Sequence, residues 1–230
     1  MALTMDQLKN KSSARLIGLH PILLSAATAL IERCYTLGVP IIITQGLRTI
    51  AEQDALYAQG RTKPGSIVTN AKGGYSYHNY GLAIDFALLL PDGKSVSWDM
   101  KRDGDGDKVT DWQEVVQEAK KLGFEWGGDW TSFKDYPHFQ MVFGLTLTQL
   151  RAGGKPSETA MAKVLANIDR YKEAATVNKE VKVTVNVNGK KIADGVLDNG
   201  TTYTPARAVA EALGARVAYD AATKTVNITK

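Results

Sequence analysis

Two short segments of the chain contain the residue types that a hydrolytic zinc site uses. Residues 76–85 read Ser-Tyr-His-Asn-Tyr-Gly-Leu-Ala-Ile-Asp, and residues 135–138 read Asp-Tyr-Pro-His. Two neutral imidazoles and one carboxylate can hold zinc and leave a fourth tetrahedral position for a water that the metal activates. His78, Asp85 and His138 are therefore the predicted ligands, and they include two of the three histidines in the chain.

A further carboxylate lies close to the second histidine. Asp135 precedes His138 by three residues, near enough to a metal held by that histidine to take a proton from the water. Taken singly, such residues are more often hydrogen-bonded core histidines or turn aspartates. Taken together, they favour a metal site with its own base. His20 is left out, because its place before Pro21 at the head of an apolar helical pattern is typical of a helix cap.

The elements that must position these residues can be inferred from composition. Residues 82–90 form an apolar run of strand length, so Asp85 is a carboxylate within a predicted buried strand. An unpaired buried carboxylate is costly, and a bound cation removes that cost. Gly81 permits a turn that lets His78 converge with Asp85. Pro137 excludes a helix interior and predicts an extended chain at the second segment.

The pattern Ser-x-His-x-x-Gly-x-Ala-x-Asp, followed by Asp-x-x-His, resembles the zinc peptidases of bacterial cell walls. The resemblance covers about residues 10–145, and the pattern is far more specific than a lone glycine motif. The family includes D-alanyl-D-alanine carboxypeptidases, D-alanyl-D-alanine dipeptidases and L-alanyl-D-glutamate endopeptidases. The resemblance implies zinc as cofactor and peptidoglycan as substrate.

Within the family, three segments are most similar to the L-alanyl-D-glutamate endopeptidases: Gly-Leu-Arg-Thr at 46–49, Tyr-Ala-Gln-Gly-Arg at 57–61 and Trp-Gly-Gly-Asp-Trp at 126–130. A D-alanyl-D-alanine carboxypeptidase is the alternative within the class. A non-catalytic wall-binding protein with a structural metal is the alternative from another class. Asp135 argues against the latter, because a structural zinc site is closed by a fourth protein ligand.

The same resemblance assigns roles to three residues upstream. Arg48 would point into the cleft, polarise the scissile carbonyl and stabilise the oxyanion. Gln53 would support the site, and it is predicted with Ser76 to bind substrate. The surrounding sequence indicates a strand, a glycine turn and then a helix. The alternatives are a surface salt bridge for Arg48 and ordinary structural roles for the other two.

An acidic segment at residues 103–114 has the spacing of a calcium loop. Oxygen ligands would stand at positions 1, 3, 5, 9 and 12, which are Asp103, Asp105, Asp107, Asp111 and Glu114. Position 6 should be glycine and is Lys108, and no clear helix precedes the loop. Calcium binding is therefore one interpretation, and an acidic turn at the start of a helix is the other.

The composition indicates whether the chain could form disulfides, be exported or span a membrane. The chain of 230 residues has one cysteine, Cys34, which cannot form an internal disulfide and is expected to be a small core residue. The first residues lack the basic and apolar regions of a signal peptide, and no apolar run reaches membrane-spanning length. A wall hydrolase of this kind resembles a phage endolysin, held in the host cytoplasm until release. An exported enzyme whose signal peptide has been trimmed is the alternative. We expect a monomer without membrane or nucleic-acid partners.

The expected fold class is α+β, with a small antiparallel sheet and flanking helices carrying the zinc site, and a separate small α+β domain. Residues 1–150 form the predicted catalytic domain and 151–178 a linker that is partly helical. Alternating valines from 181, the Asn-Gly turn at 188–189 and a helix near 206–213 predict the second domain at 179–230. It resembles the copper amine oxidase N-terminal-like domain. Copper is not implied, because residues 151–230 contain neither histidine nor cysteine.

Charge differs between the two parts. Residues 1–150 carry 15 basic and 16 acidic side chains, whereas residues 151–230 carry 13 basic and 8 acidic ones. A basic second domain favours attraction to a polyanion, for which anionic wall polymers are the predicted partner. The part lacks a nucleic-acid motif and an aromatic stacking surface. An ordinary solvated surface is the alternative.

Overall fold

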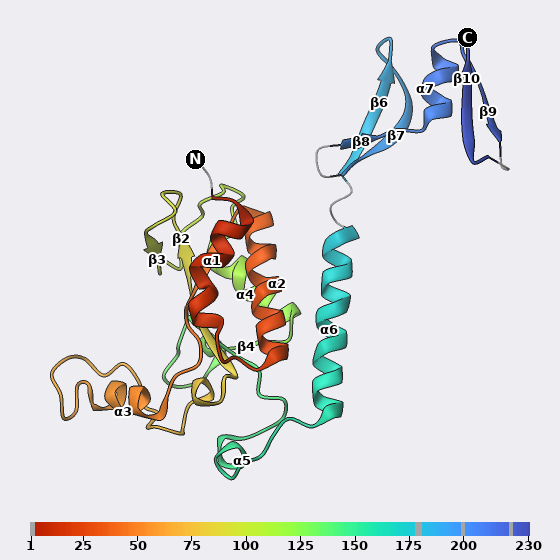
Figure 1. The fold of residues 1–230 in the computed structure, drawn as a ribbon. Helices are drawn as coiled ribbons and strands as arrows, with labels where there is room; N and C mark the ends of the chain where they lie inside the picture. The colour runs from red at the N-terminus through yellow and green to blue at the C-terminus, as the bar shows by residue number, and fades with distance from the viewer. Residues whose placement is uncertain (1–2, 178–180, 199–200, 221–222) are drawn as a thin grey trace. The chain divides into compact units, whose positions relative to one another are not determined.

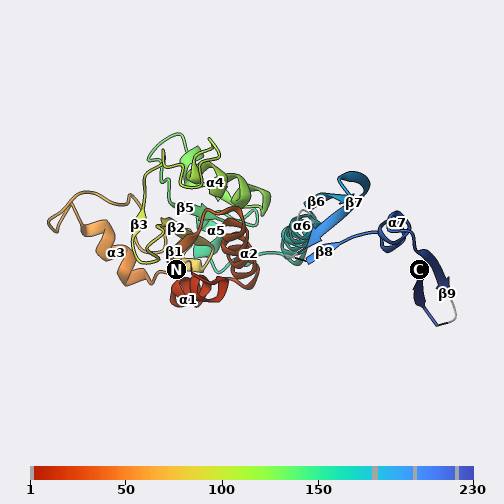
Figure 2. The same cartoon turned by 90° about the horizontal axis from the view of Figure 1, so that it is seen from above.

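The computed structural model describes residues 3–177, 181–198, 201–220 and 223–230. The chain divides into two compact units, Met1–Lys172 and Glu173–Lys230. Figure 1 and Figure 2 show the two units from the front and from above. The metal-ligand candidates all lie in the first unit.

A five-stranded antiparallel sheet forms the centre of the first unit. Its strands are β1 (Ile41–Gln45), β2 (Ala83–Leu89), β3 (Val96–Ser97), β4 (Glu125–Trp126) and β5 (His138–Gln140). The order is β1-β2-β5-β4, and the short β3 pairs with the far end of β2. Strand β2 is therefore interior to the sheet, with hydrogen-bonded neighbours along both of its edges.

The helices of this part of the chain are α1 (Met5–Leu16), α2 (Pro21–Leu37), α3 (Ile50–Ala58), α4 (Asp111–Lys121), α5 (Leu147–Arg151) and α6 (Glu158–Val177), with two 3-10 turns, η1 (Tyr77–Tyr80) and η2 (Gly127–Asp129). Helices α1, α2 and α4 contact the strands of the sheet. Local sequence explains several boundaries. Capping boxes at Thr4 and Thr49 start α1 and α3, and a left-handed Gly38 ends α2. The His20 side chain accepts a hydrogen bond from the Ile22 backbone, which confirms its predicted capping role.

The two faces of the sheet serve different purposes. Ile84, Phe86 and Leu88 of β2 point into the hydrophobic core, where Phe86 packs on Trp112 of α4 and stacks on Phe139 of β5. Because side chains alternate along a strand, Asp85 points to the opposite face. The core face holds the sheet on its helices, and the other face is left for polar chemistry.

Helix α6 as far as Lys172 belongs to the first unit and packs beside α2 and α4. Ile168 is fully buried in the same core, and the Tyr171 hydroxyl donates to the Glu118 carboxylate on α4. The Asn167 amide donates to the Lys121 carbonyl at 2.6 Å. Glu118 also pairs with Arg33 and Lys121, so the contact is apolar at its centre and ionic at its edge.

The second unit contains β6 (Val181–Val187), β7 (Lys190–Asp198), β8 (Thr201–Tyr203), α7 (Ala206–Ala212), β9 (Arg216–Asp220) and β10 (Thr225–Thr229). Strands β6, β7 and β8 form one antiparallel sheet, and β9 and β10 form a second. The turn between β6 and β7 holds Asn188 and Gly189 at positive φ, as the Asn-Gly hairpin signal predicts.

The expected α+β class with its small antiparallel sheet and flanking helices is confirmed. Cys34 is buried without a disulfide, as expected of a small core residue. No helix among the described residues is long and apolar enough to cross a membrane.

Candidate metal centre and catalytic cleft

Three ligand atoms from three elements converge on the polar face of the sheet. His78 lies in η1, Asp85 in β2 and His138 at the start of β5. His78 Nε2, His138 Nδ1 and Asp85 Oδ1 are each 3.2 Å from the other two. Both histidines are buried. The three residues predicted as ligands are therefore brought together and could hold a metal ion.

Secondary structure accounts for this convergence. Asp85 and His138 are register partners on neighbouring antiparallel strands, so their side chains share a face. His78 reaches them because Gly81 ends η1 in the left-handed conformation with φ 65°. A Cβ at Gly81 would lie 2.6 Å from the Gly18 carbonyl oxygen, so glycine is also required by space.

Hydrogen bonds on the far side of each imidazole show which nitrogens face the centre with a lone pair. His78 Nδ1 lies 2.8 Å from the Gly46 carbonyl oxygen, which can only accept, so Nδ1 carries the proton and Nε2 does not. His138 Nε2 lies 3.1 Å from Gln140 Oε1, which leaves the lone pair on Nδ1. Two lone pairs and a carboxylate thus face one another, an arrangement that a cation stabilises.

The electrostatics of Asp85 agree with this. Burial opposes ionisation of Asp85, but His78 and His138 outweigh it and hold the pKa of the carboxyl well below its usual range. Conversely, burial lowers the pKa of His138, yet its hydrogen bond with Asp85 and the nearby Asp135 raise the value overall. Asp85 is therefore an anion that attracts either a proton or a metal ion to the centre.

Arg48 and Gln53 lie behind Asp85. Arg48 Nη2 is 3.5 Å from Asp85 Oδ2, and Arg48 Nη1 donates to Gln53 Oε1 at 2.8 Å. Gln53 is fully buried, and its amide nitrogen donates to the Ala71 carbonyl at 2.8 Å. Arg48 thus occupies the second carboxylate oxygen and leaves Oδ1 for the metal. The fully buried Gln53 supports Arg48 from a position away from solvent.

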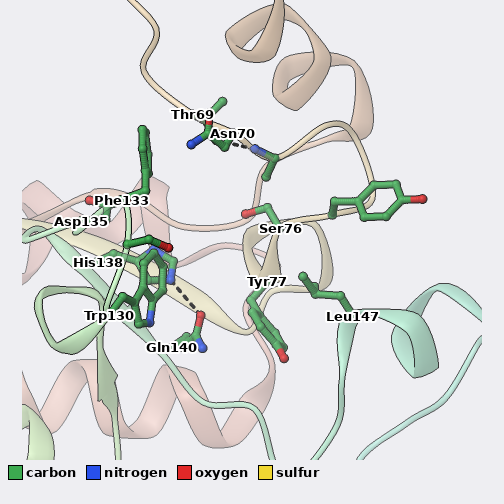
Figure 3. Close-up of a pocket in the computed structure, with 13 residues that line it drawn as sticks. Thr69, Asn70, Ser76, Tyr77, Trp130, Phe133, Asp135, His138, Gln140 and Leu147 are labelled. Atoms are coloured by element: carbon green, nitrogen blue, oxygen red, sulfur yellow. Dashed lines mark hydrogen bonds between the residues drawn. The ribbon is translucent and has the colours of Figure 1, made fainter.

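A cleft of about 390 Å³ opens in front of His138. Its described lining comprises Thr69, Asn70, Ala71, Tyr75, Ser76, Tyr77, Trp130, Ser132, Phe133, Asp135, His138, Gln140 and Leu147. Figure 3 shows Ser76 on one side of it and Trp130 beside His138, whose ring centroids are 5.1 Å apart. Of the predicted substrate-binding residues, Ser76 lines this cleft, whereas Gln53 is not among the described lining residues.

Asp135 also borders the cleft, held by the segment at 126–130. Its backbone nitrogen donates to the Gly127 carbonyl at 3.2 Å, and its own carbonyl accepts from His138. Partial burial and the negative charge of Asp85 raise the pKa of Asp135. A Cβ on Gly127 would lie 2.4 Å from the Asp135 carbonyl oxygen, so the glycine allows the two backbones to approach.

Three groups around the centre are not found by the sequence argument: the Gln140 side chain, the Glu125 side chain and the Gly46 carbonyl. Gln140 follows His138 by two positions on the same strand, and that period predicts a shared face. Glu125 is paired with Gln140 across β4 and β5, which the sequence shows only if the strand pairing is known. The Gly46 contact uses a backbone carbonyl, which every residue has, so the residue type gives no indication of it.

The acidic loop brings its carboxylates together in two overlapping groups. The first contains Asp103, Asp105 and Asp107, and the second Asp105, Asp111 and Glu114, with ligand oxygens within 4.8 Å of one another in each. Lys108 adopts φ 76°, the left-handed conformation for which position 6 of a calcium loop usually has glycine.

The same loop also contains interactions that need no ion. Asp103 accepts backbone hydrogen bonds from Gly106 and Lys108, and Asp111 pairs with Arg102 at 2.9 Å. Burial and the four surrounding aspartates raise the pKa of Glu114 to about 7. An acidic turn at the start of α4 therefore explains much of the geometry.

Comparison with known proteins places this geometry in a class. Residues 69–141 match the family described as D-alanyl-D-alanine carboxypeptidase, and residues 184–230 match the copper amine oxidase N-terminal domain. The peptidoglycan L-alanyl-D-glutamate endopeptidase CwlK of Bacillus subtilis (strain 168) is 59% identical over 124 residues, which are 54% of this chain and 74% of that protein. The chain therefore belongs to this family of peptidoglycan peptidases, and the resemblance seen in its sequence is confirmed.

Two further proteins are similar to parts of this chain. The L-alanyl-D-glutamate peptidase of a Listeria phage is 34% identical over 119 residues, which are 52% of this chain and 36% of that protein. The solved structure of the L-Ala D-Glu endopeptidase ChiX of Serratia marcescens covers 58% of this chain and 87% of its own, with 25% identity and a TM-score of 0.42.

Proposed function

We propose that the chain is a zinc-dependent endopeptidase that hydrolyses the L-alanyl-D-glutamate bond of peptidoglycan stem peptides. The observation that carries this is the convergence of His78, Asp85 and His138 beside Asp135, in a cleft of a chain 59% identical to an L-alanyl-D-glutamate endopeptidase. A D-alanyl-D-alanine carboxypeptidase is the alternative within the family, because the matching family bears that description.

Zinc fits the donor set better than a hard cation does. Two imidazole nitrogens and one carboxylate oxygen are typical zinc ligands, whereas calcium and magnesium take oxygen ligands. Tetrahedral zinc ligands at about 2.0–2.1 Å from the metal stand about 3.3 Å apart, close to the 3.2 Å between each pair of ligand atoms here. When bound, zinc supplies a Lewis acid that lowers the pKa of a water and polarises a carbonyl.

The protein's own residues supply the proton transfers and the orientation. Asp135 takes a proton from the attacking water and returns it to the leaving amine, and its raised pKa suits a base that must also act as an acid. Ser76 donates a hydrogen bond to the substrate backbone from the wall of the cleft. Arg48, paired with Asp85, orients that carboxylate, and it adds positive potential near the developing oxyanion.

Asp135 also separates an enzyme from a wall-binding protein with a structural metal. A structural zinc site has four protein ligands, and only three converge here among the residues that the structure describes. A carboxylate that borders the open cleft beside a three-ligand centre is the arrangement of a catalytic site.

The second unit is proposed to attach the enzyme to the wall. The second unit, residues 173–230, has two more basic than acidic side chains, and residues 151–172 at the end of the first unit have three more. Anionic wall polymers are the proposed partner of this basic part of the chain. We propose a monomeric enzyme that acts on the wall after release from the host cytoplasm. The phage relative supports this endolysin-like interpretation. For the acidic loop we propose calcium as a second ion, supported by its two groups of converging carboxylates.

The test of the activity is mass spectrometry of fragments released from purified peptidoglycan. Cleavage of the L-alanyl-D-glutamate bond leaves L-alanine on the muramic acid and a free amino group on D-glutamate. A carboxypeptidase releases free D-alanine instead, and that product would replace the proposed specificity with the alternative. If neither the zinc-loaded protein nor its Asp135→Asn variant releases any fragment, the catalytic assignment is contradicted.

A further inference from the structure

The two ligand histidines present opposite ring nitrogens to the metal centre. His78 offers Nε2, whereas His138 offers Nδ1. A histidine ligates through only the nitrogen that carries no proton, so each ring must be held in a different tautomer. For His78 the Gly46 backbone carbonyl fixes the tautomer, and a backbone carbonyl cannot reverse its polarity.

For His138 the partner is a side-chain amide, which can present either oxygen or nitrogen. Gln140 faces His138 Nε2 with Oε1 at 3.1 Å, and its amide nitrogen donates to Glu125 Oε2 at 2.9 Å. An ionised carboxylate only accepts hydrogen bonds, so Glu125 forces the NH2 group toward itself and the oxygen toward the ring. Without Glu125 both amide orientations are open.

Strand pairing holds these three residues in line. His138 and Gln140 are two positions apart on β5, and Glu125 is the register partner of Gln140 on β4. His138 and Gln140 are buried, so water does not readily replace a lost partner. Glu125 is exposed, so its charge costs little desolvation.

We propose that Glu125 and Gln140 are positioning residues that fix the Nε2-protonated tautomer of His138 and so make Nδ1 the metal-binding atom. The inference rests on the proposed zinc site. If Gln140 cannot accept, the buried Nε2–H group loses its partner, and the proton moves to Nδ1, where Asp85 Oδ1 lies 3.2 Å away. That tautomer blocks the position of the metal.

The experiment compares zinc affinity, measured by competition with a chromophoric chelator, in four variants of the full chain. Gln140→Leu removes the acceptor, and Glu125→Gln removes the group that orients it. The double variant Glu125→Gln with Gln140→Glu exchanges the two functional groups, so that a carboxylate accepts directly from His138. Gln113→Leu on the exposed side of α4 is the control for a glutamine replaced elsewhere.

A second measurement reports the tautomer itself. Nitrogen-15 NMR of the imidazoles distinguishes protonated, free and metal-bound nitrogens, and the chain has only three histidines. In the wild-type protein loaded with zinc, we expect metal on Nδ1 of one histidine and on Nε2 of another. In the metal-free Gln140→Leu variant, the His138 proton should have moved from Nε2 to Nδ1.

We expect Gln140→Leu to weaken zinc binding by about 10- to 100-fold, Glu125→Gln to weaken it less, and the double variant to restore it to near the wild-type value. Equal zinc affinity in wild type and Gln140→Leu, or a double variant as weak as Gln140→Leu, would overturn the inference. If Gln140→Leu does not fold, an unchanged zinc affinity and an unchanged His138 tautomer in Glu125→Gln would likewise overturn the inference. Failure of the wild-type protein to bind zinc would instead contradict the proposed function.

Discussion

Asp85 on β2 and His138 on β5 are register partners, with Oδ1 and Nδ1 3.2 Å apart on the polar face of the sheet. Their core-side neighbours Phe86 and Phe139 stack with centroids 5.0 Å apart. The packing that stabilises the sheet therefore also sets the separation of two metal ligands. A site built on paired strands changes less with loop motion than a site built on loops.

Mutations should distinguish the proposed base from the proposed metal ligands. Asp135→Asn removes the base and none of the three proposed ligands, so we expect zinc to stay bound while the turnover falls by about 10²- to 10⁴-fold. Asp129→Asn, a change of the same kind at a half-exposed residue paired with Lys120, is the control and should keep its activity. Metal analysis and hydrolysis of purified peptidoglycan are the measurements.

His78→Ala, in contrast, should lose zinc together with activity. It removes one of three ligands and leaves the Gly46 carbonyl without its donor. Zinc retained at one equivalent after this change would contradict the ligand assignment. Near wild-type turnover by zinc-loaded Asp135→Asn would place the base on another residue.

Gly127 should control the position of Asp135. Gly127→Ala puts a methyl group where the Asp135 carbonyl oxygen lies 2.4 Å away, so the loop before β5 must shift. We expect a loss of about 1–3 kcal/mol in the free energy of unfolding, as for other overpacked sites, and a larger fall in activity than in zinc content. Thermal unfolding, metal analysis and turnover are compared. Unchanged turnover would show that the backbone contact does not position the base.

The sequence predicts the metal centre better than its surroundings, for physical reasons. The apolar run at residues 82–90 predicts a buried strand that contains Asp85, and Gly81 permits the turn that returns His78, so both follow from local rules. The contact of Arg48 with Asp85 depends on where a long side chain ends in three dimensions. The pairing of Glu125 with Gln140 depends on which strands become neighbours. Local sequence contains neither fact.

Residues 151–178 illustrate the same limit. Their composition indicates a helical connection, whereas the burial of Ile168 and the bond from Tyr171 to Glu118 depend on a complementary surface formed by α2 and α4. The compact unit accordingly extends to Lys172.

Glu114 should make the stability of the acidic loop depend on pH. Its pKa is raised to about 7 by burial and by the aspartates at 103, 105, 107 and 111. The folded protein therefore binds this proton more tightly than the unfolded chain, and stability falls as pH rises from about 4.5 to 7. At pH 8 with a chelator, Glu114→Gln should gain on the order of 1 kcal/mol, allowing for solvent screening. At pH 4 the gain should vanish, as thermal unfolding can show.

Calcium gives the complementary test of the same loop. If the ion binds, millimolar calcium should raise the melting temperature of the wild-type protein through preferential binding to the folded state. Asp105→Ala should abolish that gain, because Asp105 belongs to both carboxylate groups. Lys108→Gly should keep it, since glycine accepts the positive φ at that position. No shift with calcium would leave the loop as an acidic helix start.

Helix α6 should be required for a stable catalytic unit. A chain ending at residue 150 exposes the core around Ile168 and leaves the buried Glu118 without its Tyr171 partner. We expect such a chain to lose several degrees of melting temperature, while a chain ending at residue 177 unfolds like the full protein. Equal melting temperatures of the two truncated chains would make α6 dispensable.

The second unit should serve attachment to the wall and not hydrolysis. Every proposed catalytic residue lies before residue 145, so deletion from residue 178 onward should reduce co-sedimentation with intact cell walls while hydrolysis of a small soluble muropeptide stays unchanged. Salt should weaken the attachment of the full chain, because exposed charges are screened beyond about 8 Å at physiological ionic strength. Equal wall binding by both chains would reduce the second unit to a spacer. Binding that is lost on deletion yet insensitive to salt would indicate a pocket for a neutral wall component, and the excess of three basic side chains in residues 178–230 would then not be its cause.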